Sequence, residues 1–192
     1  MKIRITPGAL LLLLVLLQSD PGILFSTLAA ALFHECGHLL AARLAHVRLQ
    51  LLELDLPGAR ILPAGALPSY RAEALLSLGG PLFSLLLFLL LLPYSHPLAL
   101  ATRTAALSQA LFNLLPVSGF DGGRVLHAML CSKMEPFYAG RVLAVLSYLS
   151  LLLLFSLASC LLLRYGVSFT LAVLSASLFA RLFLLSEAET TS

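Results

Sequence analysis

The sequence predicts an all-α polytopic membrane protein of about six transmembrane helices, with a small β-hairpin after the second helix. Three observations predict this class: a mean hydropathy of +1.00, a hydrophobic share of 60% and a charged share of only 11%. Soluble domains contain about 25% charged residues. Because a spanning helix takes about 20 residues, six helices use most of the 192 residues and leave no separate soluble domain of ordinary size. We therefore expect a single domain over 1–192.

The first helix is predicted at about 3–18, where Lys2 and Arg4 precede an apolar run. A cleavable signal peptide starts in the same way. Its nearest small-residue cleavage site, Ala29-Ala30-Ala31, lies inside the next predicted helix. A short spanning helix is therefore the preferred interpretation.

The other spanning helices are predicted from apolar runs bounded by polar and turn-forming residues, at about 23–45, 72–92, 98–115, 138–163 and 166–185. Residues 47–67 differ from these runs. Val47 to Leu51 alternates in polarity, and Pro57-Gly58 is a turn signal, so this stretch predicts the hairpin. Residues 124–134 are predicted to form an amphipathic interfacial segment.

The second predicted helix contains Phe33-His34-Glu35-Cys36-Gly37-His38. His34 and His38 are one helical turn apart and share a face. This is the H-E-x-x-H spacing, in which two histidines bind zinc and the glutamate acts as general base. Ionisable groups at bilayer depth are costly and indicate function. The competing interpretation is a pair of core histidines satisfied by hydrogen bonds, with Glu35 as a partner; Cys36 is predicted to pack.

A catalytic zinc ion takes three protein ligands, so a third must come from elsewhere in the chain. Of the nine acidic residues, only Glu35 and Asp121 lie where the core of the bundle can hold them. Asp121 follows Pro116 in a glycine-containing helix break and is therefore the third ligand by elimination. Glu35 is rotated by about 100° from His34 and can act on the attacking water instead. The sequence thus predicts one Zn²⁺ per chain.

The distribution of positive charge predicts the orientation of the bundle. Of the twelve Lys and Arg residues, only Arg103 and Arg164 fall on the side opposite the termini. The positive-inside rule then places both termini and the catalytic side in the cytoplasm of a multi-pass cell-membrane protein surrounded by the lipid bilayer. The basic residues are scattered singly, which excludes a nucleic-acid partner.

Together these motifs resemble the site-2 protease family of intramembrane zinc metalloproteases. His34-Glu35-Cys36-Gly37-His38 looks like the family's helix motif, and Asp121-Gly122-Gly123, with Asn113 and Pro116, looks like its second motif. Gly80-Pro81 is similar to the central-helix signature. With six short spans and no PDZ insertion, the sequence looks most like the branch containing stage IV sporulation protein FB. That branch often carries a CBS domain, and these residues include none. Ser84 stands where many relatives have Asn, and Phe120 where Leu is usual.

The resemblance implies a zinc metalloendopeptidase that hydrolyses peptide bonds in transmembrane or membrane-associated protein substrates, under the control of membrane regulators. It implies His34, His38 and Asp121 as metal ligands and Glu35 as the catalytic residue. Neighbours of the substrate or active site are then Asn113, Gly80, Pro81 and Ser84. Two alternatives remain: a divalent-metal transporter, for which His96 is the outer candidate ligand, and a non-catalytic scaffold of the same fold.

Overall fold

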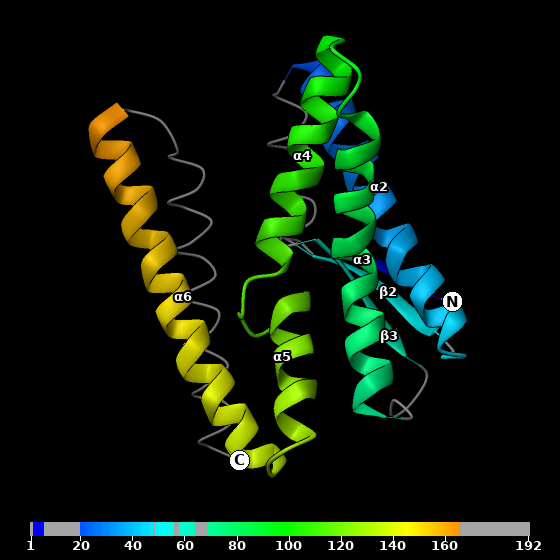
Figure 1. The fold of residues 1–192 in the computed structure, drawn as a ribbon, viewed down its shortest axis with the longest axis vertical. Coiled ribbons are helices and arrows are strands. Elements are labelled where there is room, and N and C mark those ends of the chain that lie inside the picture. Colours follow the sequence, from blue (N-terminus) through cyan, green and yellow to red (C-terminus); the bar gives the residue numbers. More distant parts are fainter. Residues whose placement is uncertain (1, 6–19, 48, 56–57, 64–68, 166–192) are drawn as a thin grey trace. The chain divides into compact units, whose positions relative to one another are not determined.

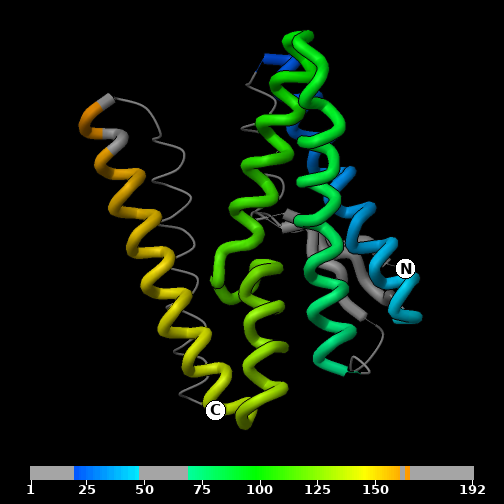
Figure 2. The backbone as a smooth tube through the Cα atoms, in the orientation of Figure 1, coloured from blue at the N-terminus to red at the C-terminus, as the bar shows by residue number. Residues whose placement is uncertain are grey.

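The computed structural model describes residues 2–5, 20–47, 49–55, 58–63 and 69–165. The described residues form three strands and five helices, in the order β1, α2, β2, β3, α3, α4, α5 and α6 (Figure 1). The chain divides into two compact units, Met1–Leu114 and Leu115–Ser192, and each is described by itself. Figure 2 traces the backbone of these elements.

The first unit contains three helices that pack against one another: α2 (Pro21–Leu44), α3 (Tyr70–Leu91) and α4 (Pro97–Asn113). Helix α2 begins where the Asp20 carboxylate accepts a hydrogen bond from the Gly22 N–H at 2.8 Å. It ends before His46, whose φ of 53° stops the helix. Helix α3 begins where the Ser69 hydroxyl accepts from the Ala72 N–H at 3.1 Å. These ends agree with the predicted ranges to within a few residues.

Helices α2 and α3 run antiparallel and approach each other closely at two glycines. A Cβ added to Gly37 would overlap the Gly79 carbonyl, and a Cβ added to Gly79 would overlap the Gly37 carbonyl. Small residues at a crossing let two helix backbones come together in a membrane. The buried residues of α2 carry small side chains and two histidines: Ser26, Ala30, His34, Gly37, His38 and Ala42.

The strands of the first unit form one sheet in the order β1-β2-β3. Strand β2 (Leu49–Asp55) pairs antiparallel with β3 (Gly58–Pro63), inside the range for which the hairpin was predicted. Strand β1 (Lys2–Ile5) pairs in parallel with β2, so the helix predicted from residue 3 is wrong for residues 3–5. The rest of that predicted helix, and the one at 166–185, lie outside the described residues.

Three described helices are long and apolar enough to cross a membrane: α2, α3 and the Pro136–Cys160 part of α6. Helix α4, with 17 residues, is shorter than these. Large apolar side chains such as Leu32 and Leu153 are exposed on the long helices, as expected for side chains that face lipid. These features indicate a membrane-associated protein, and the number of six spanning helices stays a prediction.

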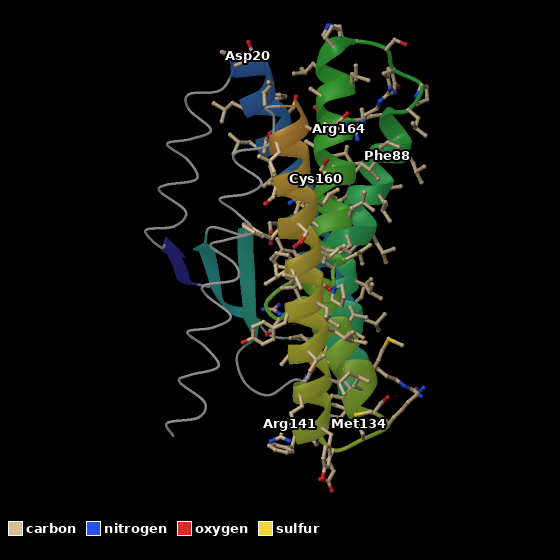
Figure 3. The ribbon with its side chains drawn as sticks, turned by 90° about the vertical axis from the view of Figure 1, so that its left-hand side faces the viewer. Asp20, Phe88, Met134, Arg141, Cys160 and Arg164 are labelled. Atoms are coloured by element: carbon tan, nitrogen blue, oxygen red, sulfur yellow. The ribbon has the colours of Figure 1, made fainter. Side chains whose placement is uncertain are left out.

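The second unit contains α5 (Asp121–Cys131) and α6 (Pro136–Tyr165). Val117 and Phe120 form its core with Leu151 of α6. Helix α5 covers most of the predicted interfacial segment but begins at Asp121, so the prediction that Asp121 lies within a helix break is wrong. Figure 3 shows Met134 and Arg141 near the beginning of α6, and Cys160 and Arg164 near its other end.

Candidate metal centre

The imidazoles of His34 and His38 lie together on the buried face of α2. Their exposed fractions are only 2% and 6%. The two Nε2 atoms are 3.2 Å apart, and the rings meet edge to face with centroids 4.8 Å apart. The helical spacing predicted from the motif is therefore present, and both Nε2 atoms point toward the same place.

Helix α3 supplies a partner for the other nitrogen of each ring. Nδ1 of His38 lies 2.8 Å from the carbonyl oxygen of Leu76, and Nδ1 of His34 lies 2.9 Å from the hydroxyl of Ser84. A carbonyl can only accept a hydrogen bond, so Nδ1 of His38 must carry the proton. Nε2 of the neutral His38 ring then keeps its lone pair, which is the form that binds a metal.

Gly80 makes room for this pair of rings. A Cβ added at Gly80 would overlap Nε2 of both His38 and His34. Gly80 lies between Leu76 and Ser84 on α3, four residues from each, so all three face α2. The absence of a side chain at Gly80 therefore leaves space beside the two lone pairs.

The separation of the two nitrogens suits a zinc ion. Zinc binds histidine nitrogen at about 2.0–2.1 Å in tetrahedral geometry, which puts two ligand nitrogens about 3.3 Å apart. The observed 3.2 Å is close to this value. The residues present therefore fit a tetrahedral metal ion, and 3.2 Å is also the distance of a hydrogen bond between the two ring nitrogens.

Glu35 is the next residue of α2 and is partly buried. One of its carboxylate oxygens is inaccessible to solvent. Because α2 is helical throughout Pro21–Leu44, the Glu35 side chain is rotated about the helix axis by about 100° from that of His34, as the motif predicts.

Asp121 is described within the second unit, where it is the first residue of α5 and is 7% exposed. The turn before it is closed by backbone bonds from the Val117 N–H to the Leu115 carbonyl (2.8 Å) and from the Phe120 N–H to the Val117 carbonyl (3.0 Å). Gly119 has a φ of 96°, which favours glycine. This turn fixes where α5 begins and so fixes Asp121.

Ser147 of α6 holds the same turn. Its hydroxyl accepts from the Ser118 N–H at 2.8 Å and lies 2.7 Å from the Leu143 carbonyl, to which it donates. Ser147 is fully buried. Because the Ser147 hydroxyl is the partner of the Ser118 N–H, this serine attaches the turn to α6. Nothing in the sequence pattern distinguished Ser147 from other helical serines.

The other predicted site residues have local roles in the structure. Asn113 is the last residue of α4, and its side-chain amide donates to the Gln109 carbonyl at 3.1 Å. Pro81 is buried in the continuous helix α3, next to Gly80. His96, the candidate outer ligand of a transporter, caps α4 by accepting from the Leu98 N–H at 3.2 Å. Cys36 is exposed, so the prediction that it packs is wrong.

Comparison with solved structures identifies the fold. The chain matches the structure described as "Site-2 Protease from Methanocaldococcus jannaschii" with a TM-score of 0.70 and 22% sequence identity, over 95% of this chain and 89% of that chain. No protein-family model and no curated protein sequence matches the chain. The protein therefore has the site-2 protease fold that its motifs resemble.

Within the first unit the structure thus brings together four predicted residues: His34, His38, Gly80 and Ser84. Sequence reasoning missed the Leu76 carbonyl, which orients His38. The spacing of four residues from Leu76 to Gly80 and on to Ser84 was a signal that could have indicated one common face. Among the described residues, His34, His38 and Asp121 are buried, and each offers one atom able to bind a metal ion.

Proposed function

We propose that the protein is an intramembrane zinc metalloendopeptidase that cleaves transmembrane or membrane-associated protein substrates. The observation that carries the proposal is the buried histidine pair, with Nε2 atoms 3.2 Å apart and both Nδ1 atoms bonded to α3. An apolar helix does not keep two such side chains without a function, because polar groups at membrane depth are costly.

We propose that His34, His38 and Asp121 together bind one zinc ion. Two neutral imidazoles and one carboxylate are a donor set that catalytic zinc sites use, and this set leaves one position for water or substrate. The burial of all three side chains supports their use as ligands rather than as solvated surface groups. The site-2 protease fold agrees with this assignment.

The chemistry follows from the donor set and from Glu35. A bound zinc ion supplies a Lewis acid that polarises a peptide carbonyl and makes water a better nucleophile near neutral pH. The Glu35 carboxylate takes the proton from the attacking water and returns it to the leaving amine nitrogen. The ring nitrogens of His34 and His38 that face α3 keep their hydrogen bonds throughout, which holds both rings in place.

The depth of the site indicates the class of substrate. At 1.5 Å per residue, His34 lies about 20 Å along the axis from Pro21 and about 15 Å from Leu44. A helix of this length and hydropathy can cross a membrane, so its middle would lie within the bilayer. Proteins with segments in or at the membrane are therefore the proposed substrates. The distribution of Lys and Arg residues supports an entrance to the proposed site on the cytoplasmic side.

The test is a Glu35→Gln variant, purified beside the wild-type protein. We expect the Glu35→Gln protein to retain its zinc and lose peptide-bond cleavage, because an amide cannot accept the water's proton. Zinc is measured by elemental analysis, and cleavage is measured on a candidate membrane substrate with and without a chelator. Cleavage by the Glu35→Gln variant at the wild-type rate contradicts the role of Glu35 as general base. A wild-type protein that cleaves no membrane substrate contradicts the protease proposal and favours a scaffold or a transporter.

The same assay tests the orientation when the protein is in sealed vesicles. A membrane-impermeant chelator added outside should stop cleavage in inverted vesicles, where the cytoplasmic face is outward. It should leave right-side-out vesicles active. The reverse pattern contradicts the cytoplasmic placement of the site and leaves the protease assignment intact.

A further inference from the structure

Three residues of α3, spaced four apart, face the histidine pair: Leu76, Gly80 and Ser84. We call them the orienting stripe. The Leu76 carbonyl bonds His38, Gly80 leaves room for both Nε2 atoms, and the Ser84 hydroxyl bonds His34. The two ends of the stripe thus bond the Nδ1 atoms of the rings, and its middle residue lies beside the two Nε2 atoms.

The two ends of the stripe hold their histidines by different means. His38 is held by a backbone carbonyl, which is present whatever side chain occupies position 76. His34 is held by a side chain, because its Nδ1 bonds the Ser84 hydroxyl at 2.9 Å. Ser84 is fully buried, so water does not replace this hydroxyl readily. The contact that orients His34 therefore depends on the side chain at position 84, whereas the contact that orients His38 does not depend on the side chain at position 76.

We propose that Ser84 is a positioning residue, which orients the His34 imidazole so that its Nε2 faces the metal. This inference depends on the proposed zinc function. With the Nδ1 proton of His34 donated to the Ser84 hydroxyl, Nε2 keeps its lone pair and the ring cannot rotate away from His38. Ser84 thereby acts on a metal ligand, and its sequence-based interpretation as a neighbour of the substrate or active site stays a prediction.

The test is metal affinity, measured without any substrate. Wild-type, Ser84→Ala and Ser84→Thr proteins are stripped of metal in detergent, and the monodisperse fraction of each is titrated with Co²⁺ while its visible spectrum is recorded. Loss of a hydrogen-bond partner of a metal ligand lowers affinity by about 10- to 100-fold. We expect such a loss, with an altered Co²⁺ spectrum, for Ser84→Ala. Threonine keeps the hydroxyl and should restore most of the affinity.

Ser77 provides the matched control, because it is a similarly buried serine of α3 without a hydrogen bond to either histidine. Ser77→Ala should bind Co²⁺ like the wild type. Wild-type affinity and spectrum in Ser84→Ala would overturn the role of Ser84. A merely structural role would make threonine, with its extra buried methyl group, at least as harmful as alanine, and that result would overturn it too. If the wild-type protein itself binds no metal, the proposed zinc function fails, and the role of Ser84 fails with that function.

Discussion

His34 and His38 are held by a neighbouring helix, whereas Asp121 is held by the turn that precedes its own helix. In the first unit, α3 contacts each imidazole directly through the Leu76 carbonyl and the Ser84 hydroxyl. In the second unit, Ser147 of α6 contacts the backbone of the turn at Ser118, which lies three residues before Asp121. The histidines are thus positioned through their side chains, and the aspartate through its backbone.

This difference teaches which substitutions should affect metal binding without unfolding the protein. Side-chain contacts to an imidazole can be removed while both helices stay packed. Contacts to a turn cannot be removed without loosening the backbone, because these hydrogen bonds hold the amides of the turn in place. Changes near the histidines should therefore separate affinity from stability, and changes near Asp121 should couple them.

The largest effect is expected for Gly80→Ala. The new methyl group would overlap both Nε2 atoms, so the rings must move apart from the positions that suit a metal ion. Only side-chain tips are displaced, and we expect metal affinity to fall by about 100-fold or more, beyond the usual effect of contacts outside the ligand set. The free energy of unfolding should change by about 1 kcal/mol or less. Metal titration and thermal unfolding measure the two quantities.

Gly140→Ala is the matched control, since a Cβ at this position of α6 meets no atom within 4 Å. It should leave metal affinity unchanged and raise stability by about 0.5–1 kcal/mol, the usual advantage of alanine over glycine in a helix. Equal metal affinity in the two alanine variants would show that the space at Gly80 has no role in the site.

A smaller effect is expected for Ser147→Ala, which removes the side-chain acceptor of the Ser118 N–H. Losing this hydrogen bond should cost about 1–2 kcal/mol of stability. Metal affinity should fall by about tenfold because the turn before Asp121 loosens. Both losses should appear with faster hydrogen exchange of the Ser118 amide.

Ser132→Ala is the control for this change, because the exposed Ser132 hydroxyl bonds a carbonyl of its own helix turn, that of Met129. A Ser147→Ala protein with unchanged exchange at Ser118 and full metal affinity would argue against the coupling of turn and site.

The histidine pair could be predicted from the sequence because both residues lie on one helix, where spacing alone puts them on one face. The burial of Asp121 could be predicted because so few acidic residues lie among the apolar helices, and its role as a metal ligand stays a proposal. The contribution of Leu76 could not be predicted, since every residue has a carbonyl and the partner is chosen by packing between α2 and α3. The close approach at Gly37 and Gly79 became informative only when the two helices were seen together.

The strand at Lys2–Ile5 shows a different limit. Its pairing partner, β2, is far away in the sequence, and four residues before an apolar run contain no period that separates strand from helix. The local pattern favoured a helix, and tertiary pairing decided otherwise. The start of α5 at Asp121 is similar, because the backbone bonds of the preceding turn determine it and glycines alone did not reveal it.

The most direct test of the account is the zinc content of purified wild-type and Asp121→Ala proteins, with Glu135→Ala as an exposed acidic control. The account predicts one zinc ion per chain in the wild type and in the control, and loss of the ion in Asp121→Ala although both histidines remain. A wild-type protein without zinc, or an Asp121→Ala protein that keeps it fully, would contradict the claim that a histidine pair and this aspartate hold one metal ion together.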